Sequence, residues 1–295
     1  MILDNLYKQK LIHPPKWMLT NTCYLTTMGS QAYGVSTDDS DLDVYGFCIP
    51  PKDMVFPHLA GEIPGFGQQV QRFEQWSEHH IRDPNKKVEY DFAVFGIVKY
   101  FQLCMENNPN MIDSLFTSRQ CVIHSTPVSE HLRDNRKLFL HKGSWHKFKG
   151  YAYAQMAKIR NKVNASNEKR AETIAKYGYD LKFAYHIVRL LNEVEQILVE
   201  GDLDLQRNRE QLKEIRRGEW SLEQVESYFE SKEKLLETTY AASKLPHGPD
   251  EAVIKKILLE CLEQHYGDLG TAIKRDVNIE GLVRDLRTLL DRYDS

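Results

Sequence analysis

A short alternation of acidic and apolar residues, Asp41-Leu42-Asp43-Val44, restricts the fold of this chain more than any other feature. A period of two is typical of a β-strand, because successive side chains of a strand point to opposite faces of the sheet. Both carboxylates would then share one face, while the two apolar side chains turn into a core. Carboxylates held side by side repel each other, and a divalent cation, Mg²⁺ in particular, would relieve that repulsion.

A Gly-Ser pair, Gly29-Ser30, precedes this alternation and follows an apolar run that predicts another strand. A small residue at a strand end lets backbone N–H groups approach a phosphate, and the hydroxyl adds a donor. An Asp-x-Asp triplet alone is common in surface turns. A Gly-Ser pair at a strand end followed by this triplet arises by chance much less often than the triplet alone. We therefore interpret the two segments together as a site for a metal ion and a phosphate.

The length and composition fit one or two domains with a sizeable core, since the chain has 295 residues, of which 41% are hydrophobic. No apolar run is long enough to span a membrane, and the first residues lack the pattern of a signal peptide. The five cysteines lie far apart and form no CxxC pair. We therefore expect reduced thiols, no membrane partner and a cytoplasmic location.

Positive charge is concentrated in one segment, although the net charge is −3. Residues 133–176 contain twelve Lys or Arg against three acids, which points to a polyanionic partner. Trp145, Phe148, Tyr151 and Tyr153 are interleaved with these cations, as on surfaces that bind phosphates and stack on bases. The alternative is an amphipathic helix with its aromatic residues in the core, and for Tyr151 and Tyr153 it is equally well supported.

The overall pattern predicts an α+β protein, with an N-terminal mixed-sheet domain at residues 1–140 and an all-helical domain at 141–295. Strands are predicted at residues 24–28, 42–49, 69–76 and 88–92. The apolar run 92–105 predicts a buried helix, and residues 50–68 an irregular insertion. Further helices are predicted at 180–201, closed by Gly201, at 221–245, opened by a capping box of Ser221 and Gln224 and stopped before Pro246, and at 250–266.

Lys182, His186 and Arg189 fall at positions i, i+4 and i+7 of the first of these later helices. They would form a stripe opposite its apolar side, and three cations on one face would complement a triphosphate. Glu193 continues the same face and offers these cations an intrahelical partner. His186 is expected to be a hydrogen-bonding histidine rather than a catalyst.

The segment MGSQAYGVSTDDSDLDVYGF, residues 28–47, resembles the signature of the DNA polymerase β-like nucleotidyltransferases. Its fuller form, GSxAYGxxxxxSDxDxxG, is similar to a branch associated with RNA ligases and RNA repair in bacteria and phages. The matching residues are Gly29, Ser30, Ala32, Tyr33, Gly34, Ser40, Asp41, Asp43 and Gly46. Residues 88–110 and 182–193 also resemble that branch, so the likeness spans roughly residues 20–200. Gln31 departs from the basic residue often found there in cellular relatives.

Enzymes of this kind use a third carboxylate from a neighbouring strand. Glu89 and Asp91 share one face of the predicted strand by alternation, so spacing does not separate them. We favour Asp91, because it lies nearer the strand end where the first two acids are expected, and keep Glu89 as the alternative.

The resemblance implies transfer of a nucleoside monophosphate from an NTP to a hydroxyl, with release of pyrophosphate. Asp41 and Asp43 would bridge two Mg²⁺ or Mn²⁺ ions, and Asp91 would hold the ion that activates the acceptor. The nucleotide would be bound by Gly29, Ser30 and Ser40 of the motif and, from the helical domain, by Lys182, His186 and Arg189.

The acceptor is the least constrained part of this interpretation. RNA, either tRNA or a repaired RNA end, is the first choice, because of the basic segment and the resemblance. The alternatives are a protein or small-molecule acceptor, and an inactive module that binds RNA or regulates a partner. The preferred base and the oligomeric state are not predicted.

Overall fold

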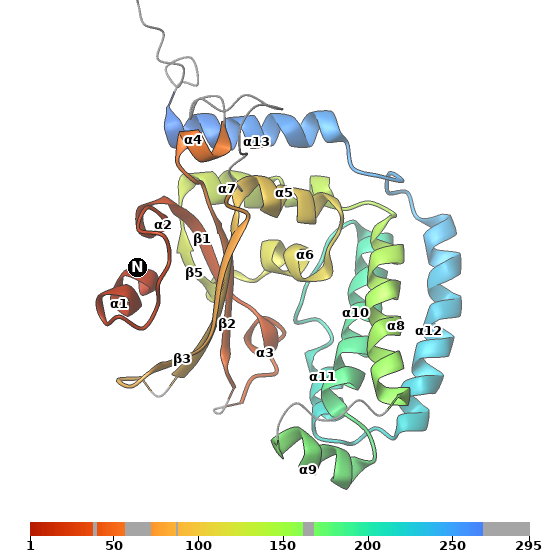
Figure 1. Ribbon diagram of the computed structural model, residues 1–295. Helices are drawn as coiled ribbons and strands as arrows, with labels where there is room; N and C mark the ends of the chain where they lie inside the picture. Colours follow the sequence, from red (N-terminus) through yellow and green to blue (C-terminus); the bar gives the residue numbers. More distant parts are fainter. Residues whose placement is uncertain (38–39, 57–71, 87, 162–167, 268–295) are drawn as a thin grey trace, which may run out of the picture.

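A mixed five-stranded sheet forms the N-terminal half of the protein, which is described here from a computed structural model (Figure 1). The structure describes residues 1–37, 40–56, 72–86, 88–161 and 168–267. The strands are β1 Thr22–Thr27, β2 Leu42–Cys48, β3 Gln75–Asp83, β4 Val88–Gly96 and β5 Val122–Ser125, in the order β3-β4-β2-β1-β5. β2 and β4 pair in parallel and the other neighbours are antiparallel. The predicted α+β class with a mixed sheet is therefore confirmed.

The two faces of the sheet are covered by different helices (Figure 1). Val44, Phe92 and Val94 pack in one apolar cluster with residues of α1 Ile2–Lys8 and α2 Met18–Asn21. Phe47 and Phe95, on the opposite face, pack in a second cluster. That cluster includes residues of α5 Ile97–Met105, α6 Pro109–Phe116 and α7 Pro127–Asp134. We call this second face the inner face, because it is turned toward the helical layer.

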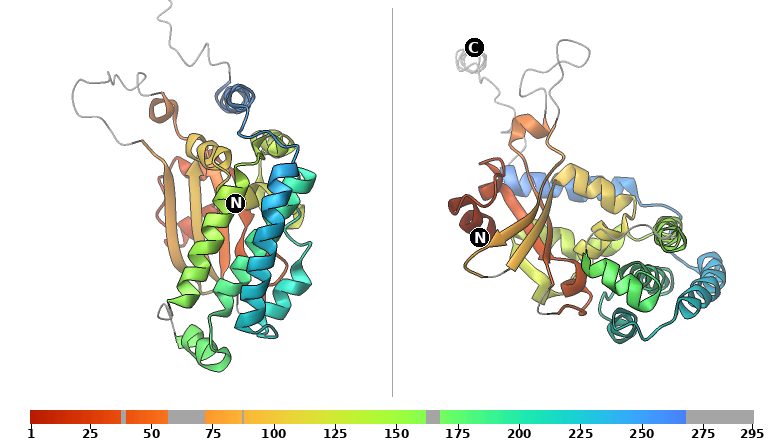
Figure 2. Two further views of the ribbon diagram at one scale, coloured as in Figure 1. Left: turned by 90° about the vertical axis from the view of Figure 1, so that its right-hand side faces the viewer. Right: turned by 60° about the horizontal axis from the view of Figure 1, so that its bottom comes forward.

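The helical layer is built around α10 Leu181–Glu200, which packs against α8 Ser144–Arg160 and α12 Leu222–Ala242 (Figure 2). The Asp180 side chain caps α10 by accepting the N–H groups of Lys182 and Phe183, and Gly201 ends it in a left-handed conformation. α9 Glu168–Tyr177, α11 Arg209–Arg216 and α13 Glu251–Tyr266 complete the longer helices of the described chain. The helices predicted at residues 180–201, 221–245 and 250–266 are confirmed, including the capping box of Ser221 and Gln224, although α12 ends at Ala242.

The last described helix, α13, returns to the N-terminal half and lies over α5 and α7 (Figure 1). The Tyr266 hydroxyl donates to the carbonyl of Pro50, and Glu260 contacts His131 at 2.8 Å. A single apolar cluster runs from the inner face of the sheet through the helical layer to α13. Among the described helices, none has the length and apolar character needed to cross a bilayer.

Two predicted elements are wrong in part. The run 92–105 is not one helix, because β4 extends to Gly96 and α5 begins at Ile97. Phe92–Gly96 lies between β2 and β3 and is buried on both faces, so its sequence lacks the alternation that identifies a half-exposed strand. The strand predicted at 69–76 begins only at Gln75, and residues 69–71 lie outside the described chain. Most of the predicted insertion also lies outside it, and Lys52–Val55 forms the short helix α4.

Candidate active site

Asp43 of β2 and Asp91 of β4 are direct neighbours in the parallel register of the two strands. Both lie on the inner face, because the residues that follow them, Val44 and Phe92, pack into the opposite cluster. The sequence prediction that Asp43 is turned away from a buried Val44 is therefore confirmed. The sheet holds two carboxylates side by side at the end where β2 begins, close to the lower ends of α8 and α10 (Figure 1).

The environment of Asp43 disfavours its negative charge. Burial and the neighbouring Asp91 carboxylate raise the pKa of Asp43, and Asp41 acts in the same direction. The Lys182 ammonium on α10 and the His79 imidazole on β3 oppose this rise. Three different elements thus place charged groups around one carboxylate, which is typical of a functional site.

Gly29 lies directly against Asp43. It begins the four-residue helix α3, Gly29–Ala32, in a left-handed conformation with φ of 58°. A Cβ atom at this position would lie 2.1 Å from Oδ2 of Asp43. The Met28 N–H donates to the Asp43 carbonyl at 2.7 Å, which ties the turn after β1 to the start of β2. Only glycine combines this backbone conformation with so close an approach to the carboxylate.

Replacing Gly29 with Ala should therefore disturb both the turn and the site. The left-handed conformation disfavours Ala by about 1 kcal/mol, and the added methyl group would push the Asp43 side chain away. We expect a modest loss of stability in urea denaturation and a much larger loss of the activity proposed below. A fully active Gly29→Ala variant would show that the contact with Asp43 does not matter.

Asp91 is held by a bulge in the edge strand β3. The register of β3 and β4 shifts between Glu78 and Ile81, and His80 adopts a left-handed φ of 58°. The His80 N–H then donates to Oδ1 of Asp91 at 2.7 Å, and Nδ1 of His79 lies 3.6 Å from the same oxygen. The backbone of the bulge therefore fixes the orientation of this carboxylate.

Glu89, the alternative third carboxylate, is engaged elsewhere. It contacts Nδ1 of His80 at 2.7 Å and accepts from Nε of Arg82 at 2.9 Å, both from β3. Asp91, in contrast, is the residue paired in register with Asp43. The geometry favours Asp91, although for another reason than the one given from sequence: the strand register decides, not nearness to a strand end.

The carboxylate pair suits a divalent cation. Mg²⁺ is commonly held by one or two protein carboxylates, with waters and substrate phosphates as the other ligands. Asp43 and Asp91 offer such a pair, and the raised pKa of Asp43 reflects a charge that a cation would stabilise. In the part of the chain that the structure describes, no three His, Cys, Asp or Glu side chains converge closely enough to hold a metal ion. Asp41 is exposed and precedes β2, and it lies within electrostatic reach of Asp43.

Ser30 and Ser40, predicted at the nucleotide, both precede Asp43 in the chain, Ser30 in α3 and Ser40 in the turn before β2. Ser30 follows Gly29 in α3 and is partly buried. The Ser40 hydroxyl accepts the Thr37 N–H at 2.9 Å and contacts the Thr37 hydroxyl at 3.2 Å, so it closes the turn before β2. The structure thus gives Ser40 a local role in shaping the loop.

The cationic stripe predicted on α10 is only partly present. Lys182 is exposed, and its ammonium forms no hydrogen bond or salt bridge with any residue the structure describes. His186 is partly buried beside the ring of Tyr185. Arg189 contradicts the prediction, because it is 5% exposed and donates to Tyr33, Asp113 and Glu193. Its charge is used inside the protein rather than at a triphosphate.

Residues 32–35, which include the Ala-Tyr-Gly part of the sequence motif, form hydrogen bonds that hold the end of α3 and the loop after it against other elements. The Tyr33 hydroxyl donates to Oδ2 of Asp113 at 2.6 Å, within the same buried network as Arg189. From the helical half, Gln206 donates to the carbonyl of Ala32 at 3.2 Å and Arg216 donates to that of Val35 at 2.8 Å. The Ala-Tyr-Gly part of the motif therefore stabilises the loop, whereas Gly29 lies against the Asp43 carboxylate of the candidate site.

Contacts within the fold neutralise part of the basic segment. Arg133 and Lys142 are buried, and Lys137, Lys147, Lys149 and Arg160 pair with carboxylates. Trp145 and Phe148 are in the core, which contradicts the prediction that they stack on bases. Tyr151 and Tyr153 are exposed, so the alternative of core packing fails for these two.

Three residues near the carboxylates were not recognised as site residues from the sequence. Tyr45 is the next inner-face residue after Asp43, and the same alternation could have found it. Burial and the two carboxylates raise the pKa of Tyr45. His79 and His80 are exposed, and only the bulge in β3 brings them to Asp91.

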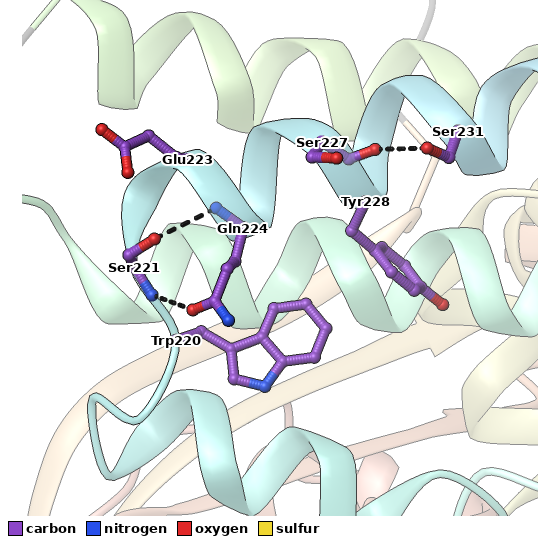
Figure 3. A pocket seen from close by; sticks show the side chains of 7 residues that line it. All are labelled: Trp220, Ser221, Glu223, Gln224, Ser227, Tyr228 and Ser231. Atoms are coloured by element: carbon purple, nitrogen blue, oxygen red, sulfur yellow. Dashed lines mark hydrogen bonds between the residues drawn. The ribbon is translucent and has the colours of Figure 1, made fainter.

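A groove on the outer helix α12 lies apart from the predicted site residues (Figure 3). Its volume is about 490 Å³, and it is lined by Trp220, Ser221, Glu223, Gln224, Ser227, Tyr228 and Ser231. Ser221 and Gln224 satisfy each other in the capping box, and the Ser231 hydroxyl donates to the Ser227 carbonyl at 2.7 Å. Three of its polar side chains are thus engaged within α12 and its cap, and the carboxylate pair stays the better candidate.

Comparison with known proteins identifies a family for this chain. A model of the RNA repair pathway DNA polymerase beta family, RlaP, matches residues 6–268. No curated protein matches. A crystal structure of a nucleotidyltransferase-like protein from Exiguobacterium sibiricum 255-15 aligns over 98% of this chain and 89% of that chain. The two chains share 9% sequence identity, with a TM-score of 0.28. The family match covers most of the sequence, and the chain belongs to the RNA repair pathway DNA polymerase beta family.

Proposed function

We propose that this protein transfers a nucleoside monophosphate from an NTP to a hydroxyl group, with release of pyrophosphate, in a reaction that requires a divalent cation. The observation that supports this most is the pairing of Asp43 with Asp91 beside the left-handed Gly29. A like-charged, partly buried pair has no evident value for stability, and it lies on the face turned toward the helical layer.

We assign the metal-binding, phosphate-binding and proton-accepting roles in this reaction to the following residues. Asp43 and Asp91 would hold Mg²⁺ or Mn²⁺, with Asp41 as the third acid of the motif. A bound cation would neutralise charge on the reacting phosphate and favour ionisation of the acceptor hydroxyl. The backbone at Gly29 and Ser30 and the exposed ammonium of Lys182 would bind the triphosphate. Asp91, oriented by the His80 amide, would take the proton of the acceptor.

We propose RNA as the acceptor, either a tRNA or an end produced during repair. The link of the family to RNA repair supports this choice. The basic segment supports it less than its composition suggested, because Lys147, Lys149 and Arg160 are paired with acids. That pairing favours a smaller acceptor, such as a protein side chain or a metabolite, as the second candidate.

A label-transfer experiment tests the proposal. The purified protein is incubated with Mg²⁺ or Mn²⁺, each α-labelled NTP in turn, and separate pools of cellular RNA, protein and small metabolites. We expect label in the RNA fraction, no transfer in EDTA, and no transfer by the Asp43→Asn variant. Label in protein or metabolites would replace RNA as the acceptor. No transfer to any pool, together with no NTP binding, would contradict the proposed activity.

A further inference from the structure

The short helix α3, Gly29–Ala32, contains the two residues whose backbone is proposed to bind the triphosphate, Gly29 and Ser30. Four residues make a single helical turn, which has little stability of its own in water. Two backbone hydrogen bonds tie this turn to the residues that follow it. The Gly29 carbonyl accepts the Tyr33 N–H at 3.3 Å, and the Ser30 carbonyl accepts the Val35 N–H at 2.9 Å. The positions of Tyr33 and Val35 therefore set the position of the turn.

The Tyr33 side chain anchors the turn to the protein interior. It is 2% exposed, and its hydroxyl donates to Oδ2 of Asp113 on α6 at 2.6 Å. Nη1 of Arg189 on α10 donates to the same hydroxyl at 2.8 Å, and Cζ of Arg189 lies 4.5 Å from the centre of the Tyr33 ring. Oδ1 of Asp113 has no hydrogen-bond partner among the described residues. The Tyr33 hydroxyl thus joins the end of α3 to two buried helices.

The helical half of the protein holds the loop after α3 at two further points. Arg216, the last residue of α11, donates from Nη1 to the Val35 carbonyl at 2.8 Å, and Gln206 donates to the Ala32 carbonyl at 3.2 Å. A Cβ atom at Gly34 would lie 3.3 Å from Cδ of Gln206, so the loop runs close to this side chain. In Figure 1, α3 lies between the sheet and the helices α10 and α11. The loop is therefore fixed by residues that lie 174 and 181 positions later in the chain.

We propose that Tyr33 and Arg216 are positioning residues for the triphosphate. They hold Gly29 and Ser30 where the backbone binds the phosphates, and neither of the two side chains touches the nucleotide. This inference rests on the proposed function and adds the contacts that set the geometry of its phosphate-binding turn. The packing of α10 and α11 against α3 thereby determines the affinity for the triphosphate.

Tyr33→Phe tests the first contact, because it removes the hydroxyl and keeps the ring. Binding of inorganic triphosphate and of a non-hydrolysable NTP analogue, each with Mg²⁺, is measured by calorimetry on the whole chain. We expect about 10-fold weaker binding of both ligands, which corresponds to the loss of about one hydrogen bond to a charged group. Hydrogen exchange of the Val35 amide, followed by nuclear magnetic resonance, should become faster, because this amide bonds the Ser30 carbonyl.

The matched control for this variant is Tyr100→Phe. Tyr100 is fully buried in the same apolar cluster as Tyr33, and its hydroxyl contacts that of Ser114 on α6 at 2.8 Å. The change removes a comparable buried hydrogen bond, but one that joins α5 to α6 rather than to the loop after α3. Tyr100→Phe should therefore bind both ligands like wild type and leave the exchange of the Val35 amide unchanged.

Arg216→Met tests the second contact, with Arg217→Met as its control. Both arginines are exposed and each change removes one positive charge, but Arg217 pairs with Glu219 instead of the loop. Arg216→Met should weaken the binding of inorganic triphosphate by about 5-fold and speed exchange at Val35. Arg217→Met should change neither quantity.

The outcomes separate positioning from general destabilisation and from direct contact. Unchanged triphosphate binding by Tyr33→Phe, or an equal loss in Tyr100→Phe, would overturn the role of Tyr33. Weaker binding by Arg216→Met with unchanged exchange at Val35 would make Arg216 a direct phosphate ligand, against its positioning role. If wild type binds neither the NTP analogue nor inorganic triphosphate, the proposed function fails first. A wild type that binds, together with a Tyr33→Phe variant that binds equally well, contradicts the positioning alone.

Discussion

Replacing Asp43 with Asn should abolish nucleotidyl transfer without weakening the fold. The amide keeps the shape of the side chain but lacks the charge that a divalent cation requires, and we expect a fall in rate of about 10³-fold or more. Stability should stay the same or rise by about 0.5 kcal/mol, because the like-charge contact with Asp91 is removed. Label transfer and urea denaturation of the same preparation measure the two effects.

Two further variants on β4 act as controls for this result. Asp91→Asn should lose transfer like Asp43→Asn, because both carboxylates belong to one pair. Glu89→Gln should retain most of the activity, because Glu89 is engaged with His80 and Arg82. The opposite outcome, an active Asp91→Asn and an inactive Glu89→Gln, would make Glu89 the third carboxylate.

Replacing Arg189 with Met should cause the largest loss of stability among the variants considered. Arg189 is the cation of a buried network that contains Asp113 and Glu193. Burial raises the pKa of both acids, and the guanidinium opposes that rise. Removing one partner from a buried ion pair typically lowers the free energy of unfolding by about 3–5 kcal/mol, since the remaining charge is left without compensation. Urea denaturation monitored by circular dichroism measures the change.

Lys182→Met, on the same helix, is the matched control. Lys182 is exposed, so its loss should change the free energy of unfolding by no more than about 0.5 kcal/mol. It should instead weaken NTP binding, because the ammonium lies within electrostatic reach of Asp43. If Arg189→Met remained stable and lost NTP affinity, Arg189 would be the phosphate ligand that the sequence stripe predicted.

Elements with a local signal could be predicted from the sequence. The alternation Asp41–Val44 predicted a strand that puts Asp43 and the buried Val44 on opposite faces of the sheet. The capping residues and Gly201 predicted the ends of the long helices. These signals are short-range, because side-chain period and capping depend on residues a few positions apart. The strand segment Phe92–Gly96 was not predicted, because a strand buried on both faces is apolar throughout and lacks the alternation of apolar and polar residues.

Contacts between distant segments could not be predicted in this way. A helical stripe assigned Lys182 and Arg189 to one face, but only the packing of α10 against Tyr33 and Asp113 shows that Arg189 is buried. A local excess of cations suggested an RNA-binding surface, but the pairing of Lys149 with Glu233 on α12 neutralises part of it. Net charge in a window contains no information on partners elsewhere in the chain.

The sequence by itself determined the candidate chemistry of this protein: a Gly-Ser turn, an acid-apolar-acid strand and a third acid on another strand. Only the tertiary structure decided which groups meet. The parallel register of β2 and β4 placed Asp91 rather than Glu89 beside Asp43, and the bulge in β3 brought the His80 amide to Asp91. The physical reason is that local conformation follows from neighbouring residues, whereas register and burial follow from how distant apolar surfaces pack together.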